Sequence, residues 1–199
     1  MSKQNRVMRA ICCMFVALVA VGLTIGLSAC AKNDEEQVTA DATEVLEAFK
    51  NPTQENLKPY FEGSGVDMSV FENNGIDIYE FASHAFAHFD YSLGEVKVDG
   101  DKATVKVTVK NASLEAAMEA ATADLESTID QYADIIVSEN GEQEFMGILY
   151  NKVYEKLNDD PQMVDTPVTM TYTKVDDVWQ VDDASIDQLI EAMFGGFNA

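Results

Sequence analysis

Apolar residues recur with a helical period in the region that follows residue 37. Between residues 38 and 50 they fall every three or four positions, which predicts an amphipathic helix that ends at Asn51-Pro52. Thr53 can cap a second, short helix that has Pro59 near its end. A third helix is predicted from about residue 77 to residue 89, where isoleucine, alanine and phenylalanine cluster on one face.

The period of the apolar residues changes to two after residue 90. The clearest segment is 102–110, where alanine and valine alternate with lysine and threonine. We expect it to pair with residues 91–98, because the intervening Asp99-Gly100 is typical of a type I′ hairpin turn. A second hairpin is predicted for residues 168–181, with its turn at Asp176-Asp177. The alternation predicts a sheet with one buried face and one face in water.

Two more helices are predicted between the hairpins. Ser113 can cap a long helix whose apolar residues continue to Ile136, and Asn140-Gly141 ends it. The next helix runs to about residue 157, so residues 113–157 form a two-helix insertion. Ser185 can cap a last helix after the second hairpin. Strands grouped apart from helices predict an α+β fold with an antiparallel sheet.

The first 29 residues have the layout of an export signal. Three basic residues, Lys3, Arg6 and Arg9, precede an uncharged apolar segment that ends at Leu27. The residues Leu27-Ser28-Ala29-Cys30 resemble the lipobox of bacterial lipoproteins, in which the cysteine thiol receives a diacylglyceryl group and the cysteine becomes the new N-terminus. The resemblance implies lipid attachment at Cys30, and two acyl chains are enough for stable anchoring.

This interpretation divides the chain into three parts. Residues 1–29 are predicted to be the signal peptide, residues 30–37 the lipidated cysteine with a polar tether, and residues 38–199 a single domain. The alternative is an uncleaved transmembrane helix, although the apolar segment is short against the roughly 17–25 residues that span a bilayer. Both alternatives place the domain on the extracytoplasmic face of the cell membrane. The other cysteines, Cys12 and Cys13, lie in the signal, so we expect no disulfide in the domain.

The charge of the domain excludes one class of partner. After Cys30 the chain carries 10 lysines, no arginine and all 35 acidic residues. Nucleic acid is excluded as a partner, because its binding needs a basic face. Docking onto anionic lipid is disfavoured for the same reason, and the acidity itself is typical of a soluble surface. The acids show no spacing of a calcium-binding loop, and no cofactor is expected.

Three stretches resemble bacterial lipoproteins with an NTF2-like (cystatin-like) domain. They are residues 86–91, residues 98–105 and residues 178–182. The resemblance implies N-terminal helices packed on a curved antiparallel sheet, and the insertion at residues 113–157 departs from the minimal fold. That insertion could cover the sheet or the mouth of a pocket. Some members of the superfamily are isomerases, but no motif here matches their catalytic residues.

Candidate site residues are few. His84 and His88 are four residues apart on a predicted helix, so both could reach one metal ion, although two ligands make a weak match and exposed histidines are the ordinary alternative. Asp90 and Tyr91 lie where a helix meets the sheet and a pocket could open, or else the tyrosine packs in the core and the aspartate is solvated. Trp179 could be a ligand platform, although a lone tryptophan on a short strand is more often core.

Another motif, Asn111-Ala112-Ser113, matches a glycosylation acceptor but is better explained as a strand end followed by a helix cap. None of these residues forms a catalytic signature. The sequence therefore favours a membrane-anchored, non-enzymatic module that binds a small apolar ligand or an envelope protein. Two alternatives stay open. An enzyme with an isomerase- or hydrolase-like pocket would need a buried carboxylate facing a tyrosine or histidine, and an envelope interaction protein would expose an apolar patch on residues 113–157.

Overall fold

The computed structural model describes residues 33–63 and 76–196, so the predicted signal peptide, Cys30 and the first residues of the predicted tether lie outside the described residues. A four-stranded antiparallel sheet has the order β1-β2-β3-β4. Its strands are β1 (Asp90–Asp99), β2 (Lys102–Ala112), β3 (Met163–Val175) and β4 (Val178–Val181). Strands that are neighbours along the chain are also neighbours in the sheet, which confirms the predicted α+β class with an antiparallel sheet.

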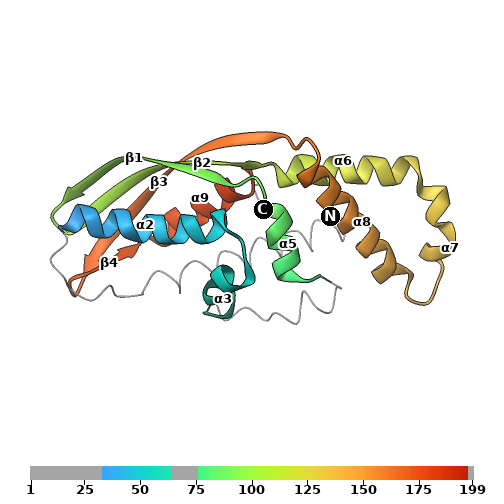
Figure 1. Ribbon diagram of the computed structural model, residues 1–199, viewed down its shortest axis with the longest axis horizontal. Coiled ribbons are helices and arrows are strands. Elements are labelled where there is room, and N and C mark those ends of the chain that lie inside the picture. The colour runs from blue at the N-terminus through green and yellow to red at the C-terminus, as the bar shows by residue number, and fades with distance from the viewer. Residues whose placement is uncertain (1–32, 64–75, 197–199) are drawn as a thin grey trace.

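The helices divide into two groups. Those that precede or follow the sheet are α2 (Asp34–Lys50), α3 (Gln54–Gly63), α5 (Ile78–Ala85) and α9 (Asp183–Met193). Those between β2 and β3 are α6 (Leu114–Ser127), the 3-10 helix η1 (Ile129–Tyr132), α7 (Ala133–Ile136) and α8 (Gly141–Asn158). Helices α2 and α9 pack on the same face of the sheet, whereas α6 to α8 extend past its end as a helical arm (Figure 1). No helix in the described ranges is both long enough and apolar enough to cross a bilayer.

The sheet has the two faces that the alternation predicts. In β2 the side chains of Val105 and Val109 are fully buried, whereas Lys106 and Lys110 are exposed. On the inner face, Tyr172 of β3 is fully buried together with aromatic residues of α2 and α5. Burial of these large side chains beneath α2 and α9 holds the sheet and helices together through the hydrophobic effect.

The two hairpin turns differ in type. At the first turn the paired residues are Asp99 and Lys102, and of the two residues between them only Gly100 has a positive φ, of 59°. A glycine with positive φ at the first central position is the type II′ pattern, so the prediction of a type I′ turn is wrong. At the second turn Asp176 and Asp177 both have positive φ, of 51° and 64°, which is the type I′ pattern.

Helix α2 begins earlier than predicted. Asn33 is its N-cap and accepts a hydrogen bond from the Glu36 N–H at 2.8 Å, and the first turn consists of three acids. That polar turn carries no apolar period, which is why the pattern starts only at Val38. Residues 34–37 therefore belong to the helix, and the predicted tether of residues 30–37 is shortened from its C-terminal side.

Three other boundaries also differ from the prediction. Helix α5 ends at Ala85 instead of residue 89, and Phe86 is its C-cap. The long helix predicted from Ser113 to beyond Ile136 breaks at Thr128, whose N–H bonds to the Leu125 carbonyl. Ser185 does not cap α9: the N-cap is Asp182, and the Ser185 hydroxyl accepts a hydrogen bond from the Thr171 N–H at 2.8 Å.

Candidate functional site

The two histidines do not form a metal site. The His84 ring stacks on Tyr154 of α8 at 4.3 Å, and its Nδ1 lies 2.8 Å from the Asn158 amide nitrogen, which uses the Nδ1 lone pair. His88 is exposed and lies beyond the end of α5, so the prediction that both share a helix face is wrong. No group of three or more His, Cys, Asp or Glu residues in the described ranges could hold a metal ion. His84 instead packs α5 against the arm.

Asp90 and Tyr91 belong to a surface network between α2 and β1. Asp90 is exposed and pairs with Lys50 at 2.7 Å, and hydrogen bonding to that lysine lowers the pKa of Asp90. The Tyr91 hydroxyl donates to Glu47 at 2.7 Å, and burial together with this carboxylate raises the pKa of Tyr91 to about 12. The pair therefore joins a helix to an edge strand. Asp90 is exposed, as the alternative to a pocket expected, whereas Tyr91 is half-buried against the core and not within it.

Trp179 is a core residue. It is only 3% exposed, and its indole N–H donates to Asp34 at 3.2 Å. Lys174 pairs with the same carboxylate at 2.6 Å and lies 5.4 Å from the centre of the indole ring. Hydrogen bonding to Lys174 is the main cause that lowers the pKa of Asp34. The three side chains attach the first turn of α2 to the second hairpin, and the indole is not available as a ligand platform.

The inner face of the sheet is filled by side chains. Phe49 of α2 packs edge to face against Phe86 beside α5, with ring centroids 5.2 Å apart, and Phe86 packs at a tilt against Phe194 after α9, with ring centroids 5.4 Å apart. Met170 and Tyr172 of β3 are fully buried. A hollow of about 420 Å³ does occur between α2 and α3, but it is an open surface feature, lined by carboxylates and amides together with Ala48, Pro59 and Tyr60. The space that a small apolar ligand would enter beneath the sheet is therefore occupied.

One partly buried carboxylate was not anticipated. Asp41 of α2 has a pKa raised to about 6, first by burial and then by Glu44. Burial raises the pKa of Tyr172 in β3, and the charge of Asp41 adds to that rise. The sequence did contain a signal for this partial burial, because Asp41 lies between the apolar positions Val38 and Ala42 of the helix. A carboxylate near a tyrosine is one requirement of the enzyme alternative, but Asp41 is not among the residues that line the hollow between α2 and α3.

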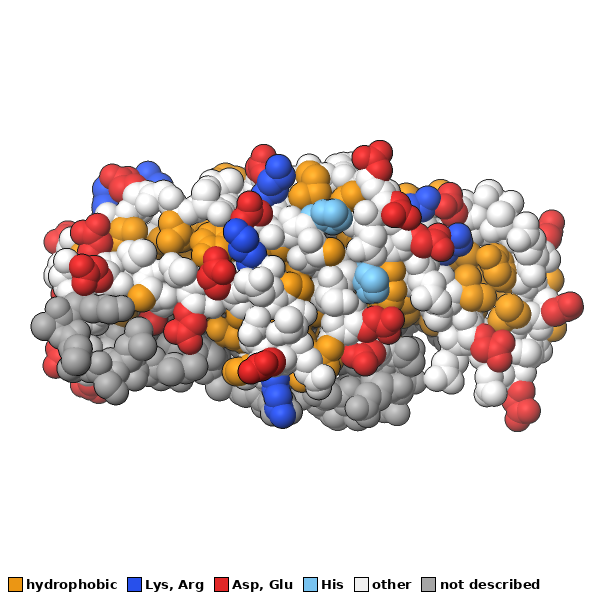
Figure 2. All heavy atoms as spheres, viewed as in Figure 1, with side chains coloured by type: hydrophobic (Ala, Val, Ile, Leu, Met, Phe, Trp, Pro, Cys, Tyr) orange, Lys and Arg blue, Asp and Glu red, His pale blue; other side chains and the backbone are white. Residues whose placement is uncertain are grey.

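The end of the helical arm exposes apolar side chains. Ile129 is 41%, Ile136 46% and Val137 83% exposed. Of the residues from 126 to 148 whose burial is described, only Gly141 is buried. We call residues 129–148 the arm tip. Figure 2 shows hydrophobic atoms gathered on the arm, at the right of the view, with acidic side chains around them.

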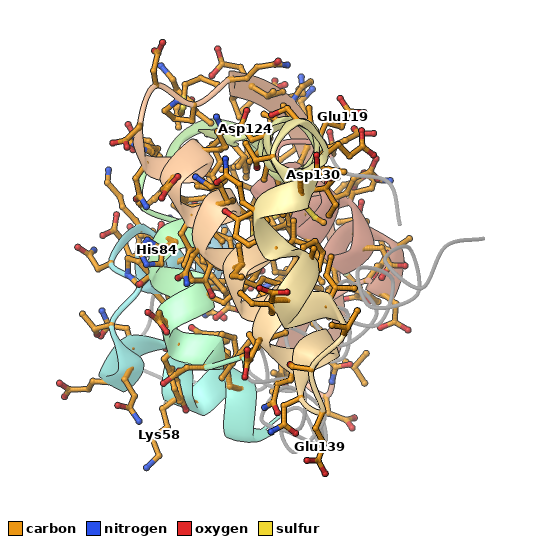
Figure 3. The ribbon with its side chains drawn as sticks, turned by 90° about the vertical axis from the view of Figure 1, so that its right-hand side faces the viewer. Lys58, His84, Glu119, Asp124, Asp130 and Glu139 are labelled. Atoms are coloured by element: carbon orange, nitrogen blue, oxygen red, sulfur yellow. The ribbon has the colours of Figure 1, made fainter. Side chains whose placement is uncertain are left out.

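The arm is also strongly acidic. Residues 113–151 contain nine acids and no basic residue. Figure 3 looks at the arm end of the molecule and shows four of these acids distributed over it: Glu119, Asp124, Asp130 and Glu139. Asp124 pairs with Lys156 of α8 at 2.6 Å, which lowers the pKa of Asp124. Asp130 and Glu139 form no ion pair with any residue that the structure describes, so their charges face the solvent.

One hypothesis from the sequence was that residues 113–157 cover the sheet. The structure shows that they do not. Helix α8 of the insertion packs against α5, and the insertion projects from the end of the sheet (Figure 1). The other hypothesis for residues 113–157 expects exposed apolar residues there, and the arm tip meets that expectation. In the acceptor motif, Asn111 is fully buried and the Ser113 hydroxyl caps α6 by accepting from the Ala116 N–H, so the motif is structural.

Comparison with protein-family models, with curated proteins and with solved structures finds no match to this chain.

Proposed function

We propose that this protein is a lipid-anchored lipoprotein of the extracytoplasmic face of the cell membrane, and that it acts by binding an envelope protein. The anchor is Cys30, on the basis of the signal layout and the Leu27-Ser28-Ala29-Cys30 resemblance. We propose binding as the activity because the described residues form an exposed apolar surface at the arm tip and no enclosed active-site cavity.

The observation that carries the binding function is the contrast between two regions of one molecule. Beneath the sheet, large side chains such as Tyr172 and Phe49 are fully buried, so side chains fill the part of the interior that the structure describes. At the arm tip, Val137 and its apolar neighbours remain uncovered. Exposed apolar side chains that lie together on a surface are typical of protein interaction sites. The contrast therefore favours a protein partner over a small apolar ligand.

We further propose that the sheet and the helices on it form an NTF2-like (cystatin-like) domain to which the arm has been added. The support is coarse: helices precede an antiparallel sheet, and α2 lies against its inner face (Figure 1). The arm between β2 and β3 is then an elaboration of that domain, which agrees with its position outside the layer of sheet and helices.

The anchor is tested by the substitution Cys30→Ser in the full-length protein. The parent is expected to sediment with membranes and to incorporate a clickable fatty acid, whereas the variant loses the label and keeps its uncleaved signal. If the Cys30→Ser protein were cleaved and still held in the membrane, the lipid-anchor proposal would be wrong. Cys13→Ser, in the predicted signal, is the matched control and should leave labelling unchanged.

A further inference from the structure

We infer that the arm tip docks an extracytoplasmic protein whose contact surface is apolar and is bordered by lysine or arginine. This inference rests on the proposed binding function and adds the surface and the chemistry of the partner. The relevant apolar side chains are Ile129, Ile136 and Val137, with the T-shaped Tyr132–Phe145 ring pair beside them.

The uncovered apolar residues lie on a well-supported base. Behind the tip, α6 and α8 pack through the buried side chains of Leu125, Leu149 and Val153. Lys156 of α8 bridges to Asp124 of α6 at 2.6 Å. At the turn into α8, a Cβ on Gly141 would lie 2.1 Å from the carbonyl oxygen of Ile135, so only glycine permits this close approach. The tip is thus held in place before a partner binds, which reduces the entropy lost on binding.

Charge selects the partner. A second copy of this chain would bring the same acidic rim against the first, and repulsion between Asp130, Asp134, Glu139 and their counterparts opposes that contact. An anionic membrane is repelled in the same way. A protein with lysine or arginine around an apolar patch is attracted at the rim and buries the tip at the centre. Residues 129–148 contain five acids and no lysine, and the two lysines that follow on α8 are paired with Glu155 and Asp124, so the tip favours a basic partner surface.

The position of the tip fits a partner outside the membrane. Helix α2 begins at Asp34, only four residues after the proposed anchor at Cys30, and its first turn lies at the opposite end of the molecule from the arm (Figure 1). Four extended residues span about 14 Å at most. The α2 end is therefore held near the bilayer, and the arm tip is free to project toward proteins of the envelope.

The first test uses a defined probe with the full-length protein in a neutral detergent. The probe is a fluorescent amphipathic helical peptide with a leucine face flanked by lysines, and anisotropy measures its binding. Replacing Ile136 and Val137 together by serine should weaken binding about tenfold or more, since about 1.4 kcal/mol is a factor of ten and two apolar side chains are lost.

The chain offers a matched control for that variant. Val175 and Val178, beside the second hairpin turn, are 44% and 40% exposed, close to the 46% of Ile136. Replacing both by serine leaves the net charge unchanged and should alter binding less than about twofold. Equal losses in the two double variants would overturn the inference, because the peptide would then respond to exposed apolar side chains in general and not to the tip. No loss in the tip variant would overturn it as well.

The second test identifies the partner in cells that make the anchored protein. A photoreactive phenylalanine analogue replaces Val137 in one strain and Val178 in another. We expect a protein adduct from Val137 alone, joined through a peptide in which lysine or arginine lies beside apolar residues. An adduct with lipid, with a second copy or with an acidic peptide contradicts the inference. Adducts from position 178 without any from position 137 would refute the arm tip as the docking surface but leave the proposed binding function standing. The absence of adducts from both positions would refute both the docking surface and the binding function.

Discussion

Asn111 connects three elements at the centre of the fold, and its replacement by leucine should destabilise the protein. Its side chain is fully buried at the end of β2, and its amide nitrogen donates to the Ala85 carbonyl at 2.9 Å and to the Met193 carbonyl at 2.6 Å. These two carbonyls belong to the last residues of α5 and α9. A carbonyl at the C-terminal end of a helix has no hydrogen-bond donor within its own helix. Leucine has a similar volume but removes both donors.

The magnitude follows from the groups left unpaired. Each buried carbonyl that loses its donor costs about 1–3 kcal/mol, so two of them cost about 2–4 kcal/mol when the site relaxes in part. The Asn111 side-chain oxygen is itself buried without a hydrogen-bond partner in the described part of the chain. Its removal returns about 1 kcal/mol, which leaves a net loss of ~1–3 kcal/mol for Asn111→Leu. Asn111→Asp should cost more at neutral pH, because a carboxylate would then face two carbonyl oxygens.

Urea unfolding of the full-length protein in detergent measures both losses. The chain has one tryptophan, and Trp179 is buried, so its fluorescence reports the unfolding of the sheet. Lys110→Leu, one residue away on the exposed face of β2, is the control and should change the free energy of unfolding by less than about 0.5 kcal/mol. A stability of Asn111→Leu equal to the parent, or an Asn111→Asp protein as stable as Asn111→Leu at pH 7, would refute the assigned hydrogen bonds.

Two further predictions concern other parts of the molecule. The pKa of Asp41 is raised from 3.8 to about 6 in the folded state, so the folded protein binds more protons and its stability falls as the pH rises through that window. Asp41→Asn should therefore be more stable than the parent at pH 7 by ~1 kcal/mol. The full pKa shift corresponds to about 3 kcal/mol, which is reduced because the carboxylate is partly exposed. Urea unfolding of both proteins at several pH values measures the difference, and a difference that stays the same below pH 4 would argue against the prediction. Gly141→Ala should separate α7 from α8 at a local cost of about 1–3 kcal/mol. Amide hydrogen exchange should then be faster in the arm and unchanged in the sheet. Full protection of the arm in that variant would count against the close contact between Gly141 and Ile135.

The sheet could be predicted because its signal is local. In β2 every second residue faces the helices, so the valines and the lysines separate onto two faces within a single strand. The first hairpin was predicted, but its turn residues are Gly100 and Asp101, one position later than the predicted Asp99-Gly100, and its type depended on which residue takes the positive φ. That choice is made by the register Asp99 to Lys102, which no short sequence motif specifies.

The helix ends could not be predicted with the same success. The apolar period runs through Thr128, since Ile129 and Ile136 continue it, yet the chain bends there into η1 and α7. Periodicity shows which side chains share a face but not whether anything covers that face. The exposure of the arm tip was therefore only one of several expectations. The electrostatic effect of Asp41 on Tyr172, which links residues far apart in the sequence, required the tertiary structure.

The distribution of lysines explains why the acidic arm can act as a separate surface. Four lysines, Lys97, Lys102, Lys106 and Lys110, lie on the outer face of the sheet, and Glu95 pairs with two of them. Others tie elements together, as Lys50 does with β1 and Lys174 with α2. Lys152 and Lys156, in the part of α8 that follows the arm tip, pair with Glu155 and Asp124, and no lysine lies within residues 129–148. At physiological ionic strength charges are screened beyond about 8 Å, so the lysines of the sheet cannot neutralise the tip from the other end of the molecule. Local charge then guides the approach of a basic partner, whereas the apolar side chains determine how long it stays.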